Sequence, residues 1–430
     1  MTTASTRVSA DTKLEELAAL QQRLLVAARA WARGGEVGPD VTETRHAALR
    51  IQHERYAALV PAYRELAEPL GATGPVPLEI VVDNLMFSGL FKSYEPALLA
   101  AGDFAGLTDW MRRVSTGIPE VDLDGVAGIG DWRGRLRQAG VFLSFSSGTS
   151  GRLSFVPRDL ATFRALVGNG ASYADPNMPM MGFDCLVLGP RGDGIGLLDA
   201  GNGLARAAVR SHFLFDRALT ADAVRGGAGW IDRQQIEEAD AAAITFIRAA
   251  IEDEHPLLVF GAPFQVRRFC ARIKGGEGRL ALPTGSLLVT GGGWKTYAGE
   301  RLTRPQLLDI VAESLAIPAE RCLDSYSTAE INASLATCRV GRYHVPPLLE
   351  AVVLDEALTG VPGQPGQGLL GFLDPFAASY PGFVITGDRA TLEFGTCDCG
   401  RSGAFLDGEI DRAPGAEIRG CGGLLGSMLA

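Results

Sequence analysis

Residues 141–157 read VFLSFSSGTSGRLSFVP, in which two apolar runs flank six residues, 146–151, that are all serine, threonine or glycine. The flanking runs have the length and composition of buried strands. A glycine-rich turn exposes backbone N–H groups and, together with hydroxyl donors, can form an anion-binding nest. The stretch lacks the lysine of the G-x-x-x-x-G-K-[ST] phosphate loop. A phosphate-binding loop and a plain hairpin turn therefore both remain open at this point.

The 430-residue chain has the composition of a globular protein, with 47% hydrophobic and 21% charged residues. Its net charge of -10 argues against a nucleic-acid partner, because binding to phosphate backbones needs clustered Lys and Arg. No apolar run approaches the ~18 residues of a membrane span, and no signal-peptide pattern opens the chain. Seven cysteines without even, disulfide-like spacing suit a reducing compartment, so we expect a cytoplasmic protein.

Hydrophobic periodicity divides the chain into three segments. Residues 13–33 and 42–68 have apolar residues at helical spacing on either side of the breaker cluster GGEVGPD, which predicts an N-terminal helical segment, 1–75. In 76–344, short apolar runs alternate with helical stretches. This alternation predicts an α/β core with a layered parallel sheet. From 345 to 430, short strands with Gly, Pro and Asp turns predict a small β-rich subdomain and a tail.

The runs that predict buried parallel strands are continuous and apolar. They are residues 184–189, 256–263 and 285–293. The intervening helical patterns include residues 241–254 and 303–316.

The last predicted strand leads into LLVTGGGWK, 287–295, where three consecutive glycines allow the backbone to approach a flat or bulky group closely. A simple strand-to-helix crossover is the alternative, and Lys295 is the last of only four lysines in the chain.

Two later stretches combine residues suited to a nucleotide. In CLDSYSTAEINAS, 322–334, Tyr326 and Glu330 lie four residues apart; an aromatic ring can stack on a base, and a carboxylate can bind a hard cation such as Mg²⁺. A surface turn with a solvated glutamate is the alternative. In FVITGDRATLEF, 383–394, a Gly-Asp turn between two strands reads as a hairpin. Asp388 at such a strand end can also accept hydrogen bonds from ribose hydroxyls.

Cysteine and histidine residues indicate a metal site. Cys397 and Cys399 form a C-x-C pair, and the stretch CRVGRYH supplies Cys338 and His344. Two ligand pairs from separate segments can complete a tetrahedral Cys₃His zinc site, although cysteine is also common in ordinary cores. We expect a structural zinc that joins the β-rich subdomain to the end of the parallel sheet and has no part in the chemistry.

Taken in order, and followed by Arg412 in IDRAPGAEIRG, these motifs resemble the acyl-adenylate-forming (AMP-binding) superfamily. The likeness is greatest to its short branch of acyl-protein synthetases and phenylacetate–CoA ligase-like proteins. TGGGWK, GRYHVPP, CDCGR and EIRGC look most like the acyl-protein synthetases, and the resemblance covers residues 80–425. It implies an adenylate-forming core, the use of ATP and Mg²⁺, and a zinc site such as some members of the branch contain.

The resemblance also implies roles for individual residues in the nucleotide site. It implies that Ser146, Ser147, Thr149 and Ser150 contact the ATP phosphates and that Gly291, Gly292 and Gly293 line the adenine and acyl pocket. Tyr326, beside Ser327 and Thr328, would stack on adenine, and Glu330 would bind Mg²⁺. Asp388 would hold the ribose, and Arg412 would contact the ribose or a phosphate. The sequence departs from the family pattern at two positions. Ala329 stands where a threonine normally contacts the α-phosphate, and Asp411 stands where a glycine usually precedes the late arginine.

The activity implied is attack of a carboxylic acid on the α-phosphate of ATP, which gives acyl-AMP and pyrophosphate, followed by acyl transfer to a protein thiol. Cys421 in EIRGCGG matches the cysteine that takes the acyl group in acyl-protein synthetases. Most of the superfamily carries a C-terminal lid with a catalytic lysine, which we expect to be absent here. Either Lys295 substitutes for that lysine or the enzyme works without a lid. Transfer to coenzyme A or to an amine, and a catalytically silent nucleotide-binding protein, are the alternatives.

Overall fold

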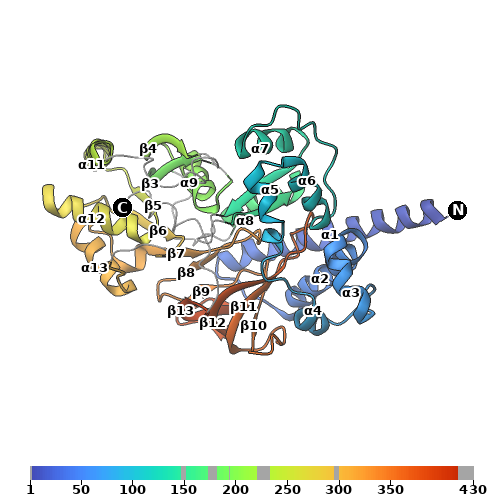
Figure 1. The fold of residues 1–430 in the computed structure, drawn as a ribbon. Helices are drawn as coiled ribbons and strands as arrows, with labels where there is room; N and C mark the ends of the chain where they lie inside the picture. Colours follow the sequence, from blue (N-terminus) through green and yellow to red (C-terminus); the bar gives the residue numbers. More distant parts are fainter. Residues whose placement is uncertain are drawn as a thin grey trace.

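A computed structural model describes residues 2–146, 152–172, 182–192, 194–219, 233–294 and 300–414. Within these ranges, an 11-stranded mixed sheet runs in the order β10-β11-β12-β13-β9-β8-β7-β6-β5-β3-β4, and helices surround it (Figure 1). The α/β fold predicted from the sequence is therefore confirmed. None of the described helices combines the length and hydrophobicity that a membrane crossing needs.

One half of the sheet is parallel, and it contains the predicted strands. Its strands are β3 (Asp184–Gly192), β4 (Ser211–Leu219), β5 (Leu257–Gly261), β6 (Leu287–Gly291) and β7 (Cys322–Tyr326). Their side chains alternate between two apolar cores. Leu186, Val259 and Leu288 share one core with helices α11 (Arg233–Glu252), α12 (Pro263–Gly276) and α13 (Arg304–Leu315), whereas Val187 and Phe260 contribute to another beside α9 (Gly196–Ala207). Burial on both faces explains why these strands are continuous apolar runs.

The other half of the sheet is antiparallel. Its strands are β8 (Leu335–Thr337), β9 (Tyr343–His344), β10 (Glu350–Leu354), β11 (Gly366–Leu373), β12 (Phe383–Thr396) and β13 (Ser402–Arg412). Strand β13 pairs with β9, so the strands after residue 345 continue the same sheet. The division of the chain at residues 75 and 345 stays a prediction.

The hairpin predicted at the Gly-Asp turn of residues 387–388 is wrong. Strand β12 continues through this point for 14 residues. Gly387 takes a left-handed conformation, φ 77°, and the register shifts on both sides of β12 nearby. A glycine at positive φ here produces a bulge instead of a chain reversal. The bulge leaves Asp388 inside the sheet, directly opposite Arg412 of β13.

The strands on either side of residues 147–151 form a separate antiparallel pair, β1 (Phe142–Ser146) and β2 (Ser154–Arg158). Both strands are largely buried, as predicted. Residues 147–151 themselves lie outside the described residues.

The predicted N-terminal helical segment is confirmed as α1 (Thr2–Ala32), α2 (Pro39–Leu59) and α3 (Pro61–Ala67), with a break before Pro61. These helices pack on the antiparallel half of the sheet: Trp31 Nε1 donates to Ser402 O at 2.8 Å, and Arg45 forms an ion pair with buried Glu350 at 2.6 Å. The described residues also form the helices η1 (Glu68–Leu70), α4 (Leu78–Asn84), η2 (Leu90–Lys92), α5 (Pro96–Ala101), α6 (Phe104–Arg113), α7 (Ile129–Gln138), α8 (Leu160–Ser172) and η3 (Ala319–Arg321).

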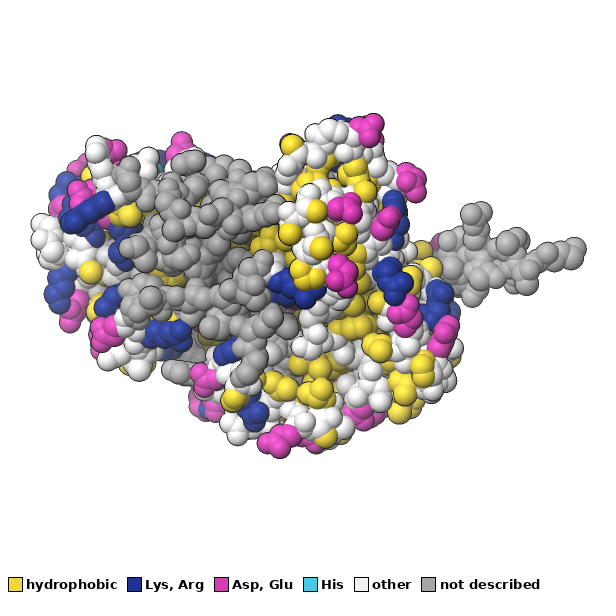
Figure 2. All heavy atoms as spheres, in the orientation of Figure 1, with side chains coloured by type: hydrophobic (Ala, Val, Ile, Leu, Met, Phe, Trp, Pro, Cys, Tyr) yellow, Lys and Arg dark blue, Asp and Glu magenta, His cyan; other side chains and the backbone are white. Residues whose placement is uncertain are grey.

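Charged side chains are mixed over the face shown in Figure 2, where the visible basic groups lie among acidic ones. Surface ion pairs of the described residues include Arg113–Glu65, Arg248–Glu277 and Lys274–Glu313. The described part of that face therefore presents the alternating charge of an ordinary protein surface, in keeping with the net charge of -10.

Candidate functional site

Tyr326, Asp388 and Arg412 meet at the junction of the two halves of the sheet. Tyr326 ends β7, and its hydroxyl donates to Asp388 Oδ2 at 2.7 Å. Arg412 ends β13, and its Nη1 donates to Asp388 Oδ1 at 2.6 Å and to Thr386 O at 3.2 Å. The Asp388 and Arg412 side chains are 20% and 23% exposed. Three residues predicted to surround one nucleotide thus form one hydrogen-bonded group.

Burial, reinforced by the Asp388 carboxylate, raises the pKa of Tyr326 well above its ordinary value. The phenol therefore stays protonated and acts as the donor toward Asp388. Stacking of its ring on adenine, which the family resemblance implies, stays a prediction.

The segment after β7 contributes Thr328 and Glu330. Both residues line a narrow pocket together with Thr386, Gly89 and Phe91. Glu330 makes no ion pair with any Lys or Arg of the described residues. The Thr328 hydroxyl is buried, and within the described part of the chain it has no hydrogen-bond partner. A carboxylate and a hydroxyl that line one pocket, neither with a partner among the described residues, are a donor set that suits a hard cation or a phosphate.

The triple-glycine turn, Gly291 to Gly293, begins at the end of β6, the strand that pairs with β7. Gly292 and Gly293 have φ of 80° and 64°, which only glycine adopts without strain. Gly291 is paired with Ser325. A Cβ at Gly291 would lie 3.5 Å from Leu197 and 3.6 Å from Ser325 O, so it would narrow the space at this edge. Gly292 and Gly293 are thus needed for the backbone conformation of the turn, while the predicted close approach to a ligand stays a prediction.

Sequence reasoning missed a second polar group next to this turn. Asp324 in β7 accepts hydrogen bonds from the Thr290 hydroxyl, at 2.5 Å, and from the Tyr343 hydroxyl. The Tyr343 ring lies edge-on to the Tyr326 ring, and their centroids are 6.5 Å apart. A carboxylate at the carboxyl end of a parallel strand was the available signal. This group joins the ends of β6 and β7 to β9, which lies two strands from β7 in the sheet.

Several predicted site residues remain untested by the geometry. Ser146 ends β1, and its hydroxyl contacts the Ser154 hydroxyl at 2.5 Å across the strand pair. Ser327 lies exposed directly after Tyr326. The remaining ones lie outside the described residues: Ser147, Thr149, Ser150, Lys295 and Cys421.

The predicted metal ligands Cys338, His344, Cys397 and Cys399 come together on the antiparallel half of the sheet. Their ligand atoms all lie within 4.8 Å of one another. The Cys338 and Cys397 sulfurs are 3.9 Å apart, and Cys399 Sγ lies 3.3 Å from His344 Nε2. Tetrahedral zinc with Zn–S bonds of ~2.3 Å separates two sulfur ligands by ~3.8 Å. The donor set and its spacing therefore fit zinc.

Two similar turns build this cluster. In C-R-V-G-R, 338–342, and in C-D-C-G-R, 397–401, the first cysteine N–H donates to the arginine carbonyl, and the glycine N–H donates back to the cysteine carbonyl. Gly341 and Gly400 have φ of 86° and 90°, so each turn needs glycine at that position. The cluster joins β8, β9, β12 and β13, and the ring of Trp31 from α1 lies 6.1 Å from that of His344.

The Cys397 thiol has a lowered pKa. Burial opposes this shift, but the Cys399 amide and the Arg342 guanidinium, 3.7 Å from the sulfur, both favour the thiolate. A thiolate is the form that binds zinc. The electrostatics at Cys397 thus agree with a metal-ligand role.

Comparisons with known proteins find similar sequences over part of the chain. Residues 235–430 match the family model described as acyl-protein synthetase, LuxE. Long-chain-fatty-acid–luciferin-component ligases of Aliivibrio fischeri and Vibrio harveyi are 29% and 32% identical over 136 and 104 residues. The matched stretches are 31% and 24% of this chain and only 35% and 27% of those relatives.

Solved structures show the same fold over more of the chain. A 2-hydroxyisobutyryl-CoA ligase, in an open conformation with 2-HIB-AMP and CoA, superposes with a TM-score of 0.55 over 86% of this chain and 74% of its own. Its structure in the thioesterification state gives 0.55 over 90% and 70%. At 15% identity this likeness concerns the fold alone. The chain therefore has the fold of adenylate-forming ligases, and the resemblance to acyl-protein synthetases is confirmed for residues 235–430.

Proposed function

We propose that this protein activates a carboxylic acid with ATP and passes the acyl group to a protein thiol, in the manner of an acyl-protein synthetase. The observation that carries the proposal is that Tyr326 and Arg412, each from a different strand, both bind the Asp388 carboxylate on a third strand. The family match of residues 235–430 supports the reaction class. The curated relatives are named long-chain-fatty-acid ligases, which supports a fatty acid as the substrate.

Asp388 is the residue best suited to hold the ribose. A carboxylate offers about four acceptor positions, and the protein fills two of them, from the Tyr326 hydroxyl and from Arg412. The remaining positions can accept the two ribose hydroxyls. Arg412 forms an ion pair with Asp388 and places positive charge beside the proposed nucleotide position.

In the first step, a carboxylate oxygen of the acid attacks the α-phosphorus of ATP. The bond from this phosphorus to the bridging oxygen breaks, and pyrophosphate leaves with the electron pair. Such chemistry needs positioning and charge neutralisation more than covalent catalysis. Glu330, which has no ion pair among the described residues, would hold Mg²⁺, and the bound ion would neutralise phosphate charge. Arg412 and the hydroxyls of residues 146–150 would supply the other contacts.

In the second step, a thiol sulfur attacks the acyl carbonyl, AMP leaves, and the thiol proton is released to solvent. A thioester retains the activation of the acyl group, so a thiol is the favoured acceptor. We assign this role to Cys421, which lies outside the described residues. Coenzyme A is the alternative acceptor, because the fold is shared with a CoA ligase.

Pyrophosphate release from ATP tests the first step, with tetradecanoic acid and a panel of shorter and aromatic acids as probes. Release that depends on one of these acids is expected, and no release with any of them would contradict the proposed enzyme and favour a silent nucleotide-binding protein. Labelled acid then tests the second step. A hydroxylamine-labile label should stay on the wild-type chain and be lost in Cys421→Ser, which should still release pyrophosphate. A label found only on added coenzyme A would instead identify a CoA ligase.

We further propose that Cys338, His344, Cys397 and Cys399 hold a structural zinc. Bound zinc would fix the two glycine turns and the end of α1 against the sheet without contact to the nucleotide site. Elemental analysis of purified protein should find about one zinc per chain. Cys397→Ser should lower both the zinc content and the melting temperature. A zinc-free protein with unchanged thermal stability would contradict the site.

A further inference from the structure

A buried arginine lies next to the segment that carries Glu330. Arg158 ends β2 and is 1% exposed. Its Nε donates to Asn332 Oδ1 at 2.8 Å, and its Nη2 donates to Ala329 O at 2.6 Å and to the Tyr380 hydroxyl at 3.0 Å. A buried guanidinium is costly unless its donors are used. Here Nε and Nη2 are directed at one short loop and at the residues supporting it, whereas Nη1 has no hydrogen-bond partner among the described residues.

Asp374 and Tyr380 complete the support from the other side. Asp374 is fully buried, and its Oδ2 accepts from Asn332 N at 2.6 Å and from Asn332 Nδ2 at 2.9 Å. The Tyr380 hydroxyl accepts from Arg158 and from Asn332 Nδ2, and it donates to Glu330 O at 3.1 Å. This hydroxyl therefore uses its one proton and both acceptor positions.

The contacts fall on the backbone of residues 329–332, which belongs to no helix or strand. Ala329 O, Glu330 O and Asn332 N are bound by Arg158, Tyr380 and Asp374, and Asn332 O accepts from Asn169 Nδ2 at 3.1 Å. A loop has no ladder of its own to set its conformation. Side chains from β2, α8 and the β11–β12 connection therefore set it here.

We propose that Arg158 is a positioning residue which, with Asn332, Asp374 and Tyr380, holds the loop bearing Glu330 against the strand that follows the hydroxyl-rich loop. Arg158 and Ser154 lie on the same strand β2, and Ser154 is paired with Ser146. The network thus connects the loop bearing Glu330 to the strand pair that ends at Ser146. This inference rests on the proposed adenylation. Catalysis is sensitive to misplacement of such groups by ~1 Å.

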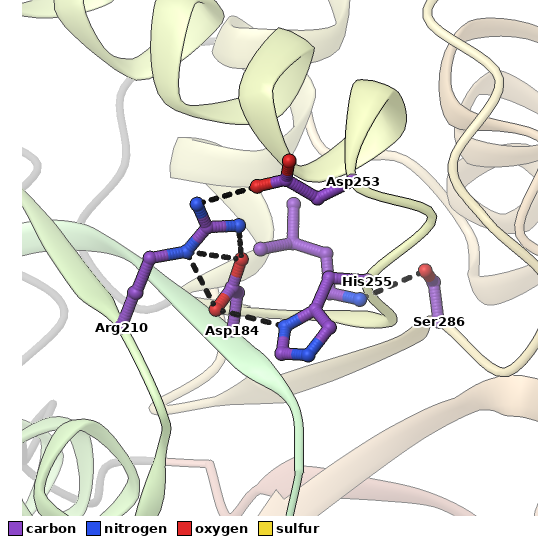
Figure 3. Close-up of polar contacts among 6 residues, drawn as sticks. Asp184, Arg210, Asp253, His255 and Ser286 are labelled. Atoms are coloured by element: carbon purple, nitrogen blue, oxygen red, sulfur yellow. Dashed lines mark hydrogen bonds and ion pairs between the residues drawn. The ribbon is translucent and has the colours of Figure 1, made fainter.

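The test compares Arg158→Met with Arg210→Met, a matched loss of an arginine that binds a buried aspartate at the opposite end of the parallel strands (Figure 3). Pyrophosphate release with tetradecanoic acid is measured against Mg²⁺ and against ATP. For Arg158→Met we expect at least a tenfold lower kcat and a severalfold higher Mg²⁺ requirement, with ATP affinity within threefold of wild type because Asp388 is intact. Arg210→Met should change both within twofold. Arg158→Lys should restore part of the rate, since an ammonium reaches some of the same acceptors.

Hydrogen exchange of the peptide covering residues 327–333 gives a readout that does not depend on activity. It should accelerate at least tenfold in Arg158→Met and stay unchanged in Arg210→Met. If the wild type releases no pyrophosphate, the proposed function fails, and the exchange result alone decides whether Arg158 holds the loop. Equal exchange in Arg158→Met and wild type would overturn the inference. So would a rate that falls only in proportion to the folded fraction, with the Mg²⁺ requirement unchanged.

Discussion

Two aspartate–arginine pairs lie at opposite ends of the parallel strands, and they differ in how many hydrogen bonds the aspartate accepts from the protein. Asp184 begins β3 and is fully buried. Arg210 contacts both its oxygens, with Nε at 3.0 and 3.2 Å, and His255 Nδ1 lies 3.2 Å from Oδ1. Arg210 also binds Asp253 at 2.7 Å (Figure 3). This closed network joins the amino ends of β3 and β4 to the chain that enters β5.

Asp388 and Arg412, at the other end, are partly exposed, and Asp388 has acceptor positions that the protein leaves unfilled. We call this the open end and the Asp184 network the closed end. Asp388 keeps one fifth of its side chain exposed and receives a single contact from each of Tyr326 and Arg412. Close by, Thr328 has a buried hydroxyl without a partner among the described residues. The same pair of residue types has saturated hydrogen bonds at one end of the strands and acceptor capacity left over at the other. The proposed nucleotide site uses that remaining capacity.

The largest expected effect is on stability, at the closed end. Asp184→Ala should lower the free energy of unfolding by ~3 kcal/mol, at the low end for breaking a buried ion pair because Arg210 stays partly solvated and keeps Asp253. ATP affinity should not change. Urea unfolding and calorimetry with ATP measure the two quantities. A loss of ATP affinity in this variant, at unchanged folded fraction, would break the distinction between the two ends.

Asp374 allows the effect of burial to be measured apart from the effect of an ion pair. It is as buried as Asp184, but it is held by the hydrogen bonds of the Arg158 network and has no direct ion pair among the described residues. Burial raises its pKa to about 6, against the hydrogen bonds from Phe376, Asn332 and the charge of Arg158. The folded state then holds a proton that the unfolded state releases between pH ~4 and pH ~6. Stability should therefore fall as pH rises through this window, by ~3 kcal/mol for ~2 pKa units, and level off above it.

Urea unfolding between pH 4 and 7 measures this dependence, with Asp374→Asn as the variant that cannot titrate. The wild-type stability relative to Asp374→Asn should decline from pH 4 to 6. A constant difference over this range would contradict the raised pKa. The variant itself should be less stable at pH 7, because both Asp374 oxygens accept from N–H donors and an amide nitrogen cannot replace either.

At the open end, the effect should be on binding. Asp388→Ala should weaken ATP binding by about 1.5–3 kcal/mol, the range for hydrogen bonds to a charged group, which is roughly 10- to 150-fold in Kd. Its unfolding free energy should change less than that of Asp184→Ala. Calorimetric titration with ATP checks the affinity. Unchanged affinity would remove Asp388 from the nucleotide site and remove the contrast with Asp184.

The smallest effect should come from Thr328→Val, which keeps the shape and removes the unpaired hydroxyl. Stability should rise by up to ~1 kcal/mol, because a buried hydroxyl without a partner is costly. Pyrophosphate release should fall if that hydroxyl contacts the phosphate or the cation. Thermal unfolding and the rate are measured on the same preparation. A gain in stability with no loss of rate would assign Thr328 to packing alone.

Much of the fold could be predicted because its signals are local. The apolar runs at 184–189, 256–263 and 285–293 became parallel strands, since burial on both faces requires continuous apolar sequence. The four Cys and His residues could be grouped from residue type and from their placement as two pairs in two short segments. The Gly-Asp hairpin failed because a left-handed glycine fits a turn and a bulge equally well. Only pairing with β11 and β13 decided between them.

By itself, the sequence determined the order of helices and strands, the glycine positions of the turns and the chemical types available at the site. The tertiary structure alone decided which of these groups meet. Tyr326 reaches Asp388 across 62 residues and Arg158 reaches Asn332 across 174. Sheet register and core packing bring such residues together, and neither leaves a periodic signal in the chain. Arg158 therefore reads as one more surface arginine in the sequence, although it is fully buried beneath the Glu330 loop.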